Sequence, residues 1–139
     1  MNDEVTEARG WLAFALGDLA AARAGRSARL RPRIVAFHAQ QAAEKAIKGA
    51  LILEDVAPPP KHDLEELRRL LPDPWQVKRR PASLDRLTDY GVDAKYPDHM
   101  VTVTPLDAAT AVRQAISVIR LISDEFQRRG VRVDDLKLQ

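Results

Sequence analysis

The sequence predicts an all-α protein: an up-and-down bundle of about five helices in one domain. Three long stretches carry apolar residues at three- and four-residue spacing, and breaks containing Pro or Gly separate them. Aromatic residues make up only 5% of the 139 residues, so the core has to be built from Ala, Leu, Ile and Val. A core of this kind indicates closely packed helices. The length is sufficient for one domain with a sizeable core.

The first two helices are long. Apolar periodicity predicts a helix over residues 3–24, followed by a basic loop with Gly, Ser and Pro over residues 24–32. The second and longest helix is expected over residues 33–56. It should end before the three prolines at 58–60, which lack backbone donors and clash with a continuing helix.

Two short helices are predicted next. The segment 62–71 has Asp63 as an N-cap, acidic residues in its first turn and basic residues near its end, an order that suits the helix dipole. Ser83 begins a fourth helix that reaches about Tyr90, and Gly91 then stands at the C′ position.

The last long helix begins at Thr104. Thr-Pro-Leu-Asp places Asp107 at the third helical position and forms a start like a capping box. Residues 92–103 before it are expected to form an extended connection, because the alternation there has no second strand to pair with. The predicted core covers about residues 5–128, and residues 130–139 are expected to be a loose tail.

Composition excludes several function classes. The net charge of +2, from 22 basic and 20 acidic residues, is too weak to indicate a nucleic-acid binder by bulk charge. The basic runs RSARLRPR and VKRRP could still form a patch for RNA or an acidic partner, or could only be solvated.

There is no cysteine, so disulfides, thiol catalysis and the commonest zinc sites are excluded. No metal and no cofactor is expected. We expect a cytoplasmic protein without a signal peptide or membrane span.

The second helix confines its polar side chains to a narrow strip in the stretch FHAQQAAEKAIKGAL. On a wheel at ~100° per residue one arc holds His38, Gln41, Glu44, Lys45 and Lys48. Apart from Gln40, the rest of the circle is apolar and wider than the stripe of a typical surface helix, which predicts a central helix. The strip is then either its exposed face, with Glu44 and Lys48 as an i,i+4 pair, or a dimer contact or ligand groove.

Three motifs in order resemble the HEPN domain family (higher eukaryotes and prokaryotes nucleotide-binding). FHAQQAAEKAIKGALI resembles the family's F-x-A-Q-Q-A-x-E-K-x-x-K-A helix, and KHDLEELRRLL resembles its His-Asp-Leu helix. KYPD resembles its Arg-Tyr-Pro-Asp-like stretch, with Lys95 in the arginine place. The resemblance covers about residues 5–128. It implies a nucleotide- or RNA-binding groove, or a dimer seam, with these residues: Gln41, Glu44, Lys45, Lys48, His62, Lys95, Tyr96 and Asp98.

The resemblance also implies a homodimer that binds or acts on RNA or nucleotides beside a minimal nucleotidyltransferase, in a toxin–antitoxin-like module. Several branches of the family are metal-independent ribonucleases with an Arg-x(4–6)-His signature on a late helix. Here residues 104–129 contain arginines but no histidine. Arg33 and His38 match the spacing at the start of the second helix and form the candidate catalytic pair. Histidine would act as the base for the 2′-OH, and arginine would stabilise the phosphorane charge. The alternative is a non-catalytic dimeric subunit that binds a nucleotide or a protein.

Other candidate residues have simpler interpretations. His62 is expected to take part in capping the helix that follows, and His99 to be a solvated loop residue. Trp75 and Tyr96 are expected to pack within the protein rather than to stack on nucleic-acid bases. The sequence contains neither glycine-rich phosphate motif nor a serine-nucleophile elbow.

Overall fold

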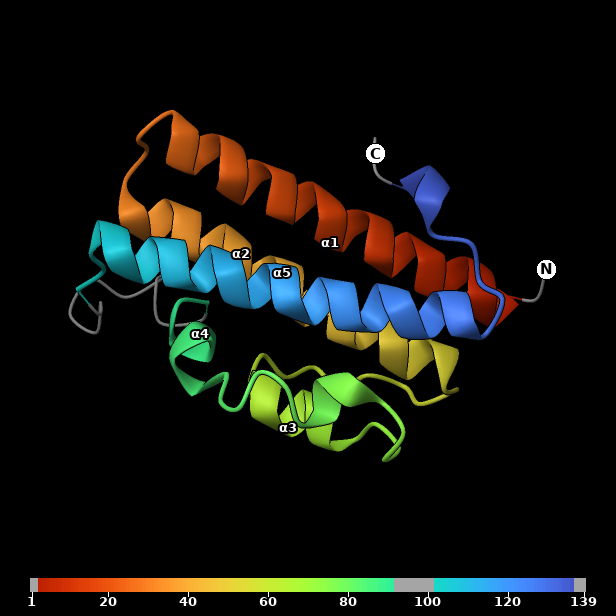
Figure 1. Cartoon of the computed structure of the whole chain (residues 1–139). Helices are drawn as coiled ribbons and strands as arrows, with labels where there is room; N and C mark the ends of the chain where they lie inside the picture. The colour runs from red at the N-terminus through yellow and green to blue at the C-terminus, as the bar shows by residue number, and fades with distance from the viewer. Residues whose placement is uncertain (1–2, 92–101, 137–139) are drawn as a thin grey trace.

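The computed structural model describes residues 3–91 and 102–136, and its three long helices lie side by side (Figure 1). The long helices are α1 (Asp3–Ser27), α2 (Pro32–Leu53) and α5 (Pro105–Arg128). The short elements are α3 (Leu64–Arg69), α4 (Asp85–Asp89) and the 3-10 turns η1 (Gln76–Lys78) and η4 (Asp134–Leu136). The described ranges contain five α-helices and no strand, so the predicted all-α class is confirmed.

Helix α2 is the central helix, as its wide apolar arc predicted. It packs against α1, α3, α4 and α5, and its alanines are buried. Gly49 shows how closely α1 approaches: a Cβ at this position would lie 3.0 Å from Trp11 Cβ and 3.1 Å from the Ala8 carbonyl oxygen. Small residues therefore bring the backbones of α1 and α2 close together. All the long helices contribute to one apolar core.

Each long helix ends in a Schellman motif. The residue at C′ has a positive φ in all three cases: Arg29 (59°), Asp55 (59°) and Gly130 (80°). The next backbone N–H then donates to a carbonyl five residues earlier, as Val56 N does to Leu51 O at 2.9 Å. Helix α1 consequently runs beyond the predicted residue 24. Helix α2 ends before the predicted residue 56, because local hydrogen bonds stop it ahead of the prolines.

The predicted N-caps at Asp63 and Thr104 are confirmed, whereas α4 begins at Asp85 rather than at the predicted Ser83. The Asp63 carboxylate accepts hydrogen bonds from the backbone N–H groups of Glu65 (2.9 Å) and Glu66 (3.2 Å). Thr104 and Asp107 form a reciprocal capping box, with bonds of 3.1 and 3.0 Å. The short helices α3 and α4 are each a residue or two shorter than predicted at both ends.

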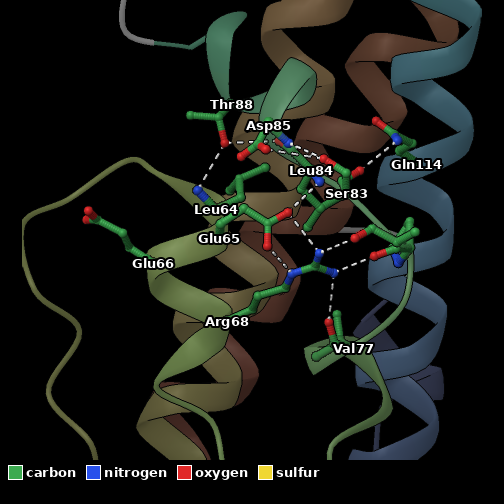
Figure 2. A network of polar contacts seen from close by, with 12 residues as sticks. Leu64, Glu65, Glu66, Arg68, Val77, Ser83, Leu84, Asp85, Thr88 and Gln114 are labelled. Atoms are coloured by element: carbon green, nitrogen blue, oxygen red, sulfur yellow. Dashed lines mark hydrogen bonds and ion pairs between the residues drawn. The ribbon is translucent and has the colours of Figure 1, made fainter.

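Arg68 ties α3 to the chain that follows it (Figure 2). Its side chain is 3% exposed, and its guanidinium donates to both Glu65 carboxylate oxygens at 2.9 and 2.8 Å. It also donates to three backbone carbonyls: Val77 at 3.2 Å, Pro81 at 2.6 Å and Ala82 at 3.2 Å. The backbone N–H of Leu84 donates to Glu65 at 2.6 Å. One buried ion pair thus organises the segment from α3 to α4.

The segment after Gly130 is ordered through Leu136, so the expectation of a loose tail is wrong there. Val131, Val133 and Leu136 are 7%, 9% and 7% exposed. Arg9 of α1 donates to the Arg132 carbonyl at 3.1 Å and forms an ion pair with Asp135. The sequence did contain a signal for this packing, because the apolar residues Val131, Val133 and Leu136 are separated by charged residues. Their burial depends on α1, which lies more than a hundred residues earlier in the chain.

No helix in the described ranges is long and apolar enough to cross a membrane.

Candidate functional site on helix α2

The polar strip of α2 contains two clusters, each organised by one carboxylate. The first carboxylate is Glu44, whose side chain is only 6% exposed. It accepts hydrogen bonds from Gln40 Nε2 at 3.0 Å and Lys48 Nζ at 2.9 Å, and His62 Nδ1 lies 3.1 Å from both of its oxygens. The expected i,i+4 pair of Glu44 and Lys48 is therefore present. The interpretation of the strip as a simple exposed face is wrong at Glu44.

Gln40 supports this cluster from a fully buried position. Its Nε2 also lies 3.3 Å from the His62 carbonyl, and its Oε1 accepts a hydrogen bond from Gln41 Nε2 at 2.7 Å. Gly91 packs directly against the Gln40 amide. The glycine stands at C′ of α4 as predicted, but its φ is not positive. It is needed because of this close approach rather than for a left-handed turn.

The Glu44 carboxylate is held in its charged form. Burial raises the pKa of Glu44, but the hydrogen bonds from Lys48, Gln40 and His62 together lower it further, so the pKa lies below 4.5. The carboxylate is therefore ionised at neutral pH and neutralises Lys48, whose side chain is 11% exposed. The polar groups of the Glu44 cluster form their hydrogen bonds with one another. The cluster therefore stabilises the fold.

The second cluster is centred on Asp18, which α1 contributes. Asp18 Oδ1 lies 3.2 Å from His38 Nδ1, and Asp18 Oδ2 accepts a hydrogen bond from Lys45 Nζ at 2.5 Å. The exposed fractions are 35% for the His38 side chain, 30% for Lys45 and 15% for Asp18. An imidazole that donates its Nδ1–H to a carboxylate leaves the lone pair of Nε2 available to accept a proton. The arrangement of Asp18 and His38 is therefore suited to proton transfer.

Asp18 was not among the predicted site residues. In the sequence it is a single acidic residue between apolar neighbours, one turn after the buried Ala15. That position borders the buried stripe of α1 and so faces the edge of a neighbouring helix. Only the packing of α1 on α2 identifies His38 and Lys45 as its partners.

Arg33 and His38 do not lie on the same face of α2. Five positions along an α-helix correspond to a rotation of ~140° and a rise of ~7.5 Å. Arg33 is half-buried in the first turn of α2. The pairing of these two residues in catalysis therefore stays a prediction, and it would need a second protomer to bring them to one phosphate.

The remaining candidates divide between packing residues and residues without a described position. Trp75 is fully buried: its Nε1 donates to Glu54 at 2.6 Å, its ring lies edge-on to Phe126, and the Arg129 guanidinium lies 4.7 Å from the ring centroid. The packing interpretation of Trp75 is confirmed. Lys95, Tyr96, Asp98 and His99 lie outside the described residues. Within the described ranges no group of three His, Asp or Glu side chains is arranged to hold a metal ion.

The comparison with family models decides the identification. The model of the HEPN domain matches residues 8–125, which include most of α1, all of α2 to α4 and most of α5. The chain belongs to the HEPN domain family. The resemblance seen in the three motifs is thereby confirmed, and this HEPN chain has a nucleotide- or RNA-related function at the level of the family. No curated protein and no solved structure matches it.

Proposed function

We propose that this HEPN protein binds RNA and cleaves it by proton transfer at His38. The observation that carries the proposal is the contact of 3.2 Å between Asp18 Oδ1 and His38 Nδ1 at the surface of the bundle. A carboxylate that holds one imidazole nitrogen orients the ring and leaves the other nitrogen for a substrate proton. Family membership supports RNA or a nucleotide as the ligand.

The chemistry requires one proton to leave and one to arrive. His38 Nε2 takes the proton of the ribose 2′-OH, whose oxygen then attacks the adjacent phosphorus. The P–O5′ bond breaks, and the leaving oxygen takes up a proton from water, whose hydroxide then receives the proton held by His38, so the products are a 2′,3′-cyclic phosphate and a 5′-hydroxyl. A cation has to stabilise the charge on the phosphorane. Two cations are candidates for this role. One is Lys45, which contacts the same Asp18 carboxylate as His38, and the other is Arg33 of a second protomer.

We also propose that the protein works as a homodimer beside a minimal nucleotidyltransferase, as the family resemblance implies. Exposed apolar side chains support a protein contact next to the Asp18 cluster. Ile34 lies one turn before His38 and is 42% exposed, and Phe14 lies one turn before Asp18 and is 66% exposed. Covering both in a dimer would place the two His38 side chains near the seam.

The Glu44 cluster favours a second candidate function, that of a non-catalytic binding subunit. Its carboxylate, amide, amine and imidazole groups are bonded to one another. Such a saturated network stabilises a surface for a partner without supplying reactive groups.

The test is RNA cleavage in the presence of EDTA by the wild type, His38→Ala and Asp18→Asn. We expect the wild type to release fragments with 2′,3′-cyclic phosphate ends, His38→Ala to be inactive, and Asp18→Asn to be slower by roughly 10²-fold or more. His62→Ala serves as the matched control, because it removes a histidine from the other cluster. Absence of cleavage by the wild type, with RNA binding retained, would favour the binding subunit.

A further inference from the structure

Helices α1 and α5 form a groove on a different side of α1 from Asp18. Three hollows adjoin one another there: Arg23 and Ile116 line the first two, and Arg26 lines the second and third. We call these adjoining hollows the α1–α5 groove. It runs from Leu16 toward Leu30, and Figure 1 shows α1 and α5 as neighbouring long helices of the bundle. On the wheel of α1, the groove residue Arg23 lies ~140° from Asp18.

The floor of the groove is aliphatic. It is formed by residues from both helices: Leu16, Leu19, Val112, Ile116 and Ile119. No aromatic residue is among the described residues that line it. The floor therefore offers an apolar strip without an aromatic surface on which bases could stack.

The rim of the groove is uniformly cationic. It carries five exposed arginines: Arg23, Arg26, Arg29, Arg113 and Arg120. None of them forms an ion pair within the described part of the chain, and no acidic residue lines the groove there. Arg113 donates only to the neighbouring Thr110 hydroxyl, at 3.0 Å. By contrast, Arg9, Arg68 and Arg129 elsewhere in the bundle are bound to carboxylates.

We propose that the α1–α5 groove binds an amphipathic helix of another protein, with aliphatic residues on its inner face and carboxylates along both flanks. Helices commonly bind in apolar grooves by this mode, and complementary rim charges select and orient the partner. From Leu16 to Ser27, the last residue of α1, the groove follows ~17 Å of that helix, or roughly three helical turns. The occupant would lie along both α1 and α5, in contact with the two helices that line the groove.

Two other occupants fit less well. In a two-fold symmetric dimer the same surface faces itself, so the arginines of two copies would repel each other across the seam. Single-stranded RNA usually stacks its bases on aromatic side chains, and this groove has none in its described lining. Both occupants become outcomes of the test.

The test measures binding of three labelled probes to the intact protein by fluorescence anisotropy. The first is a helical peptide of about 18 residues with Leu on one face and Glu on both flanks. The second has Lys in place of every Glu, and the third is an oligouridylate of about 12 nucleotides. The groove variant is Arg23→Glu with Arg120→Glu. Its matched control, Arg69→Glu with Arg132→Glu, makes the same change in net charge at exposed positions outside the groove.

We expect the acidic peptide to bind, the lysine peptide not to bind, and the groove variant to raise the Kd for the acidic peptide by about tenfold or more. The control variant should change that Kd by less than about twofold. Absence of binding by the acidic peptide at about 1 mM would overturn the proposal. Equal losses in both variants would overturn it too. So would oligouridylate binding that depends on Arg23 and Arg120 and displaces the peptide, or a loss of dimer in the groove variant alone.

Discussion

Gly91 lies against the side-chain amide of Gln40, and a Cβ at position 91 would come within 2.6 Å of both Gln40 Cδ and Oε1. The same amide bonds to Glu44, Gln41 and the His62 carbonyl. The end of α4 is therefore coupled to the buried carboxylate of α2. A side chain at position 91 could be accommodated only by displacing Gln40 from this network.

Gly91→Ala should consequently destabilise the protein by about 1–3 kcal/mol, because overpacking forces Gln40 out of its position. Urea unfolding followed by circular dichroism measures the free energy of unfolding. Gly10→Ala is the control: it lies inside α1 with nothing within 4 Å of the new Cβ, and should stabilise by about 0.5–1 kcal/mol. Similar effects of the two substitutions would contradict the packing argument.

Glu44→Ala should cost about 3–5 kcal/mol, because it leaves the largely buried ammonium of Lys48, whose side chain is 11% exposed, without its counter-ion. The double variant with Lys48→Met removes the unpaired charge and should recover a substantial part of that loss. Glu66→Ala breaks an exposed pair with Lys61 at 3.3 Å and should change stability by less than about 1 kcal/mol. The hypothesis fails if Glu44→Ala resembles Glu66→Ala in the same urea titration.

Stability should fall on acidification below about pH 4.5, in part because of Glu44 and Glu65. Burial raises the pKa of each carboxyl, but hydrogen bonds lower it further, to Glu65 chiefly from Arg68 and the Leu84 N–H, so both pKa values lie below 4.5 in the folded protein. A depressed carboxyl pKa stabilises the folded state above the unfolded pKa, and this contribution disappears as pH falls through the folded pKa. Urea unfolding at several pH values checks it: Glu44→Gln should flatten the acid limb, and an unchanged limb would contradict the assignment.

Arg68→Ala should cost about 3–5 kcal/mol, because three carbonyls and the Glu65 carboxylate lose a buried donor at once (Figure 2). Arg69→Ala at the next, exposed position should stay within about 0.5 kcal/mol of the wild type. Thermal unfolding of both variants distinguishes them. Equal melting temperatures would show that the network around Arg68 contributes little.

Truncation after Gly130 should destabilise the protein by about 2–5 kcal/mol, because it uncovers α1 where Val131, Val133 and Leu136 are buried. Truncation after Leu136, which removes only residues 137–139, is the matched control and should have little effect on the melting temperature. If both truncations melt like the full chain, the segment 131–136 is dispensable for stability.

The sequence by itself was sufficient for the features that depend on local interactions. The apolar period predicted the three long helices, and residue type predicted the caps at Asp63 and Thr104, because a cap bonds to backbone within three residues. The wide apolar arc of α2 predicted its central place. The helix ends at Arg29 and Asp55 were missed, because residues other than Gly rarely adopt a positive φ.

Only the tertiary structure decided which distant side chains meet. Asp18 reaches His38 because small residues let α1 and α2 approach closely, and no periodicity encodes that pairing. The burial of Glu44 likewise depends on His62 arriving from the next segment. The rim of the α1–α5 groove joins Arg23 to Arg120, residues far apart in the chain, because α1 and α5 pack side by side. Local propensity acts over a few residues, whereas a site is assembled by contacts that close long stretches of chain.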